Sequence, residues 1–161
     1  MKRLFENVCR DLEVELRELF DQNFSDGSWF GRKWQRKRDG TASHLQRTSQ
    51  LRKSLRYRRT ASGVQVTSSQ PYASIHNEGG EIEVTRQMKR YFWAQYYKAG
   101  KRGKEAEEWR ALALKPVGSK IRIPERRFVG DHPRVHQAVK EVVDAAVEEM
   151  AREMAKKTGS R

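Results

Sequence analysis

The chain has little of several features that define common protein classes. Among its 161 residues there are one cysteine, Cys9, and four prolines. A lone thiol excludes a scaffold of intrachain disulfides, and a zinc site would need His or carboxylate ligands. No apolar run approaches the ~20 residues that a transmembrane helix needs. Acidic side chains between Glu6 and Glu15 interrupt the stretch that a signal peptide would keep apolar, so we expect a protein of a reducing cytoplasm.

Carboxylates are scarce relative to basic residues. The 34 Lys and Arg residues exceed the 21 Asp and Glu residues, which gives a net charge of +13, and only 36% of the chain is hydrophobic. The excess charge lies in the middle: residues 28–60 carry +10, residues 86–115 carry +6 and residues 116–130 carry +3, whereas 1–20 and 131–157 each carry −1. A basic surface speeds encounters with nucleic acid, acidic proteins or lipid head groups without identifying the partner.

Both ends of the chain predict long amphipathic helices. Residues 2–20 place apolar side chains at three- and four-residue steps, with Glu and Arg on the other face. Residues 133–156 repeat this pattern, with Asp131 as a plausible N-cap and Pro133 in the first turn. We expect the two helices to pack in the core of a single domain over residues 1–161.

The middle of the chain predicts short strands. Residues 54–60 and 63–69 alternate apolar and polar side chains around a short turn, as in a hairpin. Shorter strands are predicted at 82–84 and 121–123, and one helical turn at 72–76. The sequence therefore predicts an α+β fold, in which long N- and C-terminal helices pack on a small, mainly antiparallel sheet.

Two segments are predicted to project from this body. Residues 31–53 form a basic loop without apolar periodicity, and residues 86–115 form a helix, a basic turn and a second helix. The aromatic content of the helical hairpin fits either packing against the sheet or contact with a second chain, and both interpretations stay open. The candidate interface residues of these arms are Trp29, Trp34, Arg36, Lys37, Arg90, Tyr91, Phe92, Trp93 and Tyr96.

Few residues occur in patterns that carry catalysis or hold a cofactor. His132 and His136 share a helical face, but the residues between them include no Glu and no third ligand is apparent. His76-Asn77 lacks the second histidine and the acidic cluster of a nuclease, and Gly79-Gly80 lacks the Lys-Ser/Thr of a phosphate-binding loop. We therefore predict no enzymatic activity and no catalytic, metal or cofactor site.

Nucleic-acid binding is the main alternative. Residues 29–38 and 86–104 combine Lys and Arg with Trp, Tyr and Phe, which is the composition of surfaces that stack on bases and contact phosphates. No helix-turn-helix, zinc finger or RNA-recognition motif is readable in the chain. A basic nucleic-acid-binding module thus stays open as the alternative to a surface that binds acidic protein neighbours.

Four short motifs follow one another in an informative order. They are SDGSW (25–29), LQRTSQLRKSL (45–55), PYASIHNEGG (71–80) and IPERRFVG (123–130). This series resembles the phage virion morphogenesis family, which includes the tail-completion protein of Mu-like tailed phages. The chain departs from the family pattern where Ser49-Gln50 replaces Thr-Gly, Arg127 replaces proline and Val129 replaces leucine. These departures bear on local backbone geometry rather than on function.

The resemblance implies a non-enzymatic structural protein of a tailed phage or prophage that acts in tail completion or head–tail joining. It implies a ring-forming neck component, assembled in the bacterial host cytoplasm and located in the virion at the neck or tail end. The implied partners are further copies of the chain and neighbouring neck, connector and tail proteins. Genomic DNA would lie nearby without sequence-specific binding, and no membrane or cofactor is implied.

The family motifs also single out individual positions. They either maintain the fold or contact partners, and both interpretations stay open. The matching positions in this sequence are Thr48, Leu51, Ser54, Tyr72, Ala73, His76, Gly79, Ile123, Pro124, Arg126, Phe128 and Gly130.

Overall fold

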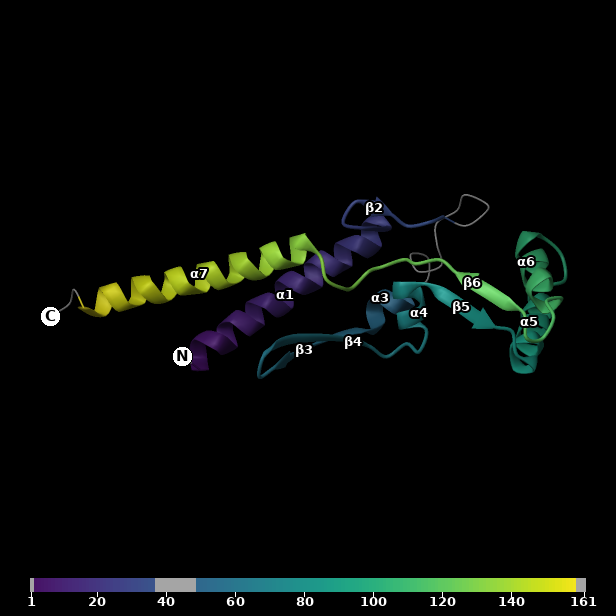
Figure 1. Ribbon diagram of the computed structural model, residues 1–161, viewed down its shortest axis with the longest axis horizontal. Coiled ribbons are helices and arrows are strands. Elements are labelled where there is room, and N and C mark those ends of the chain that lie inside the picture. Colours follow the sequence, from purple (N-terminus) through teal and green to yellow (C-terminus); the bar gives the residue numbers. More distant parts are fainter. Residues whose placement is uncertain (1, 37–48, 159–161) are drawn as a thin grey trace. The chain divides into compact units, whose positions relative to one another are not determined.

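The computed structural model describes residues 2–36 and 49–158, which fold into two compact units. Unit 1 joins residues 1–78 to residues 125–161, and unit 2 comprises residues 79–124. Figure 1 shows the helices and strands of both units. The single domain expected from the sequence stays a prediction. Most of the predicted basic loop, including Lys37 and Thr48, lies outside the described residues.

Unit 1 is built on two long helices, α1 (Lys2–Asp26) and α7 (Pro133–Thr158), which contact each other and run in opposite directions in Figure 1. The predicted apolar stripe of α1 is buried, with Leu12, Leu16 and Phe20 at most 8% exposed. The helix continues beyond residue 20, where the predicted helix ended, because Phe24 lies four residues after Phe20 and is also buried. The middle and end of α1 are therefore core, as predicted, whereas α7 buries only Ala138 among its described residues and leaves Val143, Val147 and Met154 exposed.

Two antiparallel ribbons complete the β-structure of unit 1. β1 (Ser28–Trp29) pairs with β2 (Arg32–Lys33), and β3 (Leu55–Thr60) pairs with β4 (Gly63–Ser68). The register of the longer hairpin runs from Leu55 opposite Ser68 to Thr60 opposite Gly63. Alternation along β3 leaves Leu55 and Tyr57 half-buried and Arg56 and Arg58 exposed, and both strands of the hairpin contact α1.

The core of unit 1 contains two aromatic clusters. Phe24, Trp34, Leu51 and Phe128 form the first, with Leu51 contributed by α3 (Gln50–Ser54) and partly buried Tyr72 and Ala73 packed beside it, Ala73 opening α4 (Ala73–Glu78). Leu16, Phe20 and Trp29 form the second, and Tyr57, Val64, Val66 and Val135 pack against it. Val129 contacts both clusters, so they adjoin each other.

Unit 2 pairs a two-stranded ribbon with a helical hairpin. β5 (Gly80–Glu83) is antiparallel to β6 (Lys120–Ile123), with Gly80 opposite Ile123. Between these strands lie α5 (Arg86–Lys98) and α6 (Lys104–Ala113), which pack on each other. The Thr85 hydroxyl accepts a hydrogen bond from the Met88 N–H at 3.1 Å and caps the start of α5. The helical hairpin predicted over 86–115 is therefore present.

The α+β class is confirmed, but the β-structure differs in one respect from the prediction. Three separate two-stranded ribbons are found in the described residues instead of one small sheet. β1–β2 and β3–β4 each pair consecutive strands, whereas β5 and β6 pair across the helical hairpin. No strand of one ribbon pairs with a strand of another among the described residues. Of the helices in the described part of the chain, none is both long and apolar enough to span a membrane.

Candidate functional site

The segment 126–129 is locked onto the end of α4 by hydrogen bonds. Asn77 Oδ1 accepts the backbone N–H groups of Phe128 at 3.0 Å and Val129 at 3.1 Å. The Arg126 N–H donates to the His76 carbonyl at 2.8 Å. Two motifs that lie far apart in the sequence, PYASIHNEGG and IPERRFVG, therefore meet in one place through backbone groups that would otherwise lack partners.

Aromatic packing adds the first and second motifs to the same place. The Trp34 indole N–H donates to the Arg127 carbonyl at 2.7 Å. The Phe24 ring lies 5.7 Å from the Trp34 ring in an edge-on arrangement and 5.1 Å from the Phe128 ring. Leu51, 1% exposed, completes this cluster. We call the assembly around Asn77, Trp34 and Phe128 the motif junction.

Two polar side chains of the junction, the buried Asn23 and the half-buried Asn77, were not predicted as site residues. Asn23, 3% exposed, accepts from the Phe30 N–H at 3.0 Å and donates to the Phe128 carbonyl at 3.5 Å. Asn77 was quoted within a motif but not singled out. A polar residue beside the apolar positions Phe20 and Phe24 was the only signal for Asn23, and its partners come from distant parts of the chain.

Arg126 is the one strongly buried cation of the described residues, at 9% exposure. Its Nε donates to the Gln35 carbonyl at 3.2 Å, so it ties the 123–130 segment to the start of the basic loop. Burial lowers the pKa of its guanidinium. The contact with the Gln35 carbonyl gives Arg126 a role in holding the start of the basic loop.

The remaining motif residues are divided between the units. Ser54 Oγ donates to the Leu51 carbonyl at 2.7 Å and lies 2.7 Å from Ser68 Oγ, which fixes α3 to the hairpin. Gly130, next to Trp29, has a positive φ of 155°. Gly79, Ile123 and Pro124 belong to unit 2. The structure thus gives most motif positions of unit 1 a packing role, and their contact with partners stays a prediction.

The expectation that Trp29 and Trp34 belong to an exposed arm is wrong. They are 9% and 8% exposed. Trp29 stacks on Phe20 with the ring centroids 6.2 Å apart and lies edge-on to His132 at 5.6 Å. Trp34 is buried among Phe24, Leu51 and Phe128, so both indoles bury their large apolar surface in the core of unit 1. Arg36, from the same segment, is exposed.

Unit 2 presents an aromatic surface on α5. Phe92 is buried at 7%, stacked on Trp109 at 6.2 Å, so it is a core residue and not the interface residue that was predicted. Tyr91 and Tyr97 are 54% and 56% exposed. Trp93 and Tyr96 are half-buried, and Arg90 is exposed. Tyr97 was not among the predicted interface residues. Its ring packs against Trp93 at 6.3 Å and lies under the Lys101 ammonium at 4.8 Å.

A basic groove lies between α1 and β3. It is lined by Arg17, Asp21, Ser49, Arg52, Lys53, Leu55, Arg56 and Tyr57. Asp21 forms a bidentate ion pair with Arg52, and its hydrogen bond raises the pKa of the Arg52 guanidinium. Burial raises the pKa of Tyr57 to about 12, although the Arg17 guanidinium, 5.0 Å above its ring, opposes this rise. The groove therefore keeps a basic surface with one internal counter-ion.

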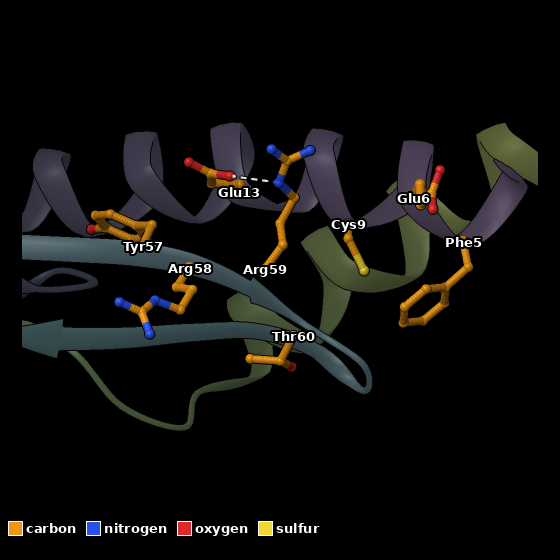
Figure 2. Close-up of a pocket in the computed structure, with 8 residues that line it drawn as sticks. All are labelled: Phe5, Glu6, Cys9, Glu13, Tyr57, Arg58, Arg59 and Thr60. Atoms are coloured by element: carbon orange, nitrogen blue, oxygen red, sulfur yellow. Dashed lines mark ion pairs between the residues drawn. The ribbon is translucent and has the colours of Figure 1, made fainter. Parts of the chain in front are cut away.

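A second groove of about 590 Å³ lies next to the first, towards the tip of the β3–β4 hairpin. Figure 2 shows its lining: Phe5, Glu6, Cys9, Glu13, Tyr57, Arg58, Arg59 and Thr60. Glu13 Oε2 pairs with Arg59 Nε at 3.3 Å. Cys9 is buried, whereas Phe5 is 42% exposed. Apolar, acidic and basic side chains share this groove, as they do at protein interfaces.

The histidines form no metal centre in the described residues, where no three His, Cys, Asp or Glu side chains converge. His132 stacks on Phe30 at 4.3 Å, and its Nδ1 accepts from the Arg134 N–H at 3.2 Å. His136 pairs with Asp131. Both side chains thus contribute to the start of α7.

Comparison with known proteins gives one match. The model of the phage virion morphogenesis family matches residues 1–148. This range includes all four motifs, the motif junction and both grooves. No curated protein and no solved structure matches the chain.

Proposed function

Because the chain belongs to the phage virion morphogenesis family and so has a structural role in phage assembly, we propose that it acts in tail completion or head–tail joining. In this proposal it is a non-enzymatic neck component that forms a ring of identical copies. Its other partners are the adjoining neck, connector and tail proteins. It reaches the neck or tail end of the virion after assembly in the host cytoplasm.

The observation that carries this proposal is the exposed aromatic surface of unit 2. Tyr91 and Tyr97 are more than half exposed on α5, while Phe92 on the same helix holds α5 against α6. Tyr91 also touches Trp109 and Tyr97 touches Trp93, but more than half of each tyrosine is left to contact another protein. Tyrosine beside basic side chains is enriched in the centres of protein interfaces. Unit 2 would thus act as an arm that grips a neighbour.

The alternative function, a nucleic-acid-binding module, is supported by the basic groove. Arg17, Lys53 and Arg56 line it, and Asp21 neutralises only Arg52. Such a groove would contact phosphates without reading bases. In the head–tail proposal these contacts would be secondary, because DNA passes through the neck without being recognised there.

Complementation of a phage or prophage that lacks the gene tests the proposal. The variant Tyr91→Ala/Tyr97→Ala should fold but lower the yield of tailed particles, counted by electron microscopy. The matched control Tyr91→Phe/Tyr97→Phe keeps the aromatic surface and should restore normal yield. Normal tailed particles from the alanine variant would exclude this arm, and normal particles without the gene would exclude the proposed function.

A further inference from the structure

The C-terminal half of α7 exposes apolar and acidic side chains together. Val143, Val147 and Met154 are 38%, 49% and 58% exposed, and their spacing of four and seven residues places them on one stripe. Residues 141–153 contain five acidic residues and one basic residue, a net charge of −4. Glu149 and Glu153 form no ion pair with any residue that the structure describes. At 100° per residue, Glu149 and Glu153 lie roughly 100–140° around the helix from this stripe and flank it. We call the stripe together with these flanking carboxylates the acidic helix face, which is the first of two complementary surfaces.

The second surface is the groove in Figure 2 together with the outer face of β3. Residues 52–59 contain five Lys and Arg residues, and no Asp or Glu occurs anywhere between residues 40 and 77. Arg58 is exposed and has no hydrogen-bond or ion-pair partner among the described residues. Phe5 supplies an exposed apolar side chain in the same groove. We call this surface the basic hairpin face.

From this complementarity we infer that the basic hairpin face of one copy of the chain binds the acidic helix face of a second copy. This inference rests on the proposed ring and assigns its contact surfaces. Arg56 and Arg58 would pair with carboxylates such as Glu149 and Glu153, and the stripe of Val143 and Val147 would cover Phe5.

The signs of charge limit how the copies are arranged. Two basic hairpin faces repel each other, and so do two acidic helix faces, so neither surface pairs with its own counterpart. A copy can exchange both contacts with one neighbour in a two-fold dimer, or use its hairpin towards one neighbour and its helix towards another, and the proposed ring requires the second arrangement. Such head-to-tail contacts close into rings or continue as filaments, depending on the rotation between copies.

The lining of the groove favours a protein occupant over DNA. The exposed ring of Phe5 finds no apolar partner on a phosphate chain. An amphipathic helix brings valines to the Phe5 ring and glutamates to Arg56 and Arg58, while Glu13 in the groove is already paired with Arg59.

Charge reversal on each surface tests the contact in the full chain. Self-association is measured by sedimentation equilibrium over a range of protein concentrations for the wild type, Arg56→Glu/Arg58→Glu and Glu149→Lys/Glu153→Lys. Each double reversal should weaken association by about ten-fold or more. Combining all four changes in one chain should restore it, which also shows that the variants fold.

Three results would overturn the inference. They are a wild type that stays monomeric at its highest soluble concentration, reversals that associate like the wild type, and a combined variant that is not restored. If Arg56→Glu/Arg58→Glu weakened only the binding of a fluorescent DNA duplex, the occupant would be DNA instead. None of these results alters the particle counts that test the proposed function, so the two failures are distinguishable.

Discussion

The side-chain oxygen of Asn77 accepts a hydrogen bond from the backbone N–H of Phe128 at 3.0 Å, across 51 positions of sequence. The same oxygen accepts from the next residue, Val129, at 3.1 Å. One amide thus helps to hold the end of α4 against the segment that leads into α7, together with the hydrogen bond from the Arg126 N–H to the His76 carbonyl.

Replacing Asn77 with alanine should destabilise unit 1. Asn77→Ala leaves two partly buried N–H groups without acceptors, which should lower the free energy of unfolding by about 1–3 kcal/mol. Urea unfolding measures the change. Asn77→Asp keeps an acceptor oxygen and should retain more of the stability. Equal losses in the two variants would mean that the hydrogen bonds are not what matters.

Replacing Ser49 with glycine should stabilise unit 1. The Ser49 backbone is left-handed, with φ 52° and ψ 6°. The Ser49 carbonyl accepts a hydrogen bond from the Lys53 N–H, within the first turn of α3. A residue with a Cβ atom in this conformation costs about 1–2 kcal/mol. Glycine avoids this cost, but it loses more backbone entropy on folding, which offsets part of the gain. Ser49→Gly should therefore raise the unfolding free energy by roughly 0.5–1 kcal/mol. Ser49→Ala keeps the Cβ and serves as the control that should show no gain.

Trp34 should behave as a core residue. Trp34→Ala removes an indole that is 8% exposed together with its hydrogen bond to the Arg127 carbonyl. The expected loss is about 3–5 kcal/mol of unfolding free energy, seen as a lower denaturation midpoint. Tyr91→Ala, at 54% exposure, should change stability by at most about 0.5 kcal/mol. If both variants changed the free energy of unfolding by similarly small amounts, Trp34 would be an exposed residue, as the sequence had suggested.

Stability should fall at alkaline pH because of Tyr57. Burial raises its pKa in the folded protein from 10.0 to about 12, so the folded state holds the phenolic proton more tightly than the unfolded chain does. This contribution is intact below about pH 10 and is lost as the pH rises towards 12. Urea midpoints measured from pH 8 upwards should show the fall. Tyr57→Phe lacks the proton and should flatten that part of the curve.

Binding to duplex DNA should be weak, independent of sequence and lost by about 200 mM salt. The reason is that the cations of the basic groove would meet phosphates, which carry no information on base sequence. Fluorescence anisotropy with two unrelated duplexes at two salt concentrations measures this. Tight binding that survives high salt, or a preference between the duplexes, would favour the nucleic-acid-binding alternative.

The sequence by itself determined most of the elements of this protein, although the β1–β2 ribbon was not predicted. Periodicity fixed α1, α7 and the β3–β4 hairpin, because each presents one apolar face over many residues. Motif order indicated the family, which the match over residues 1–148 confirms. These features depend on near neighbours in the chain, so local patterns suffice to predict them.

Only the tertiary structure decided which residues are buried and which are exposed. Trp29 and Trp34 have the same basic sequence neighbours that an exposed arm would have, yet they are buried because residues 126–132, about a hundred positions later, pack against them. Asn23 and Asn77 became central for the same reason, since their partners are distant backbone groups. Burial depends on contacts between remote segments, and no local pattern in the chain records those contacts.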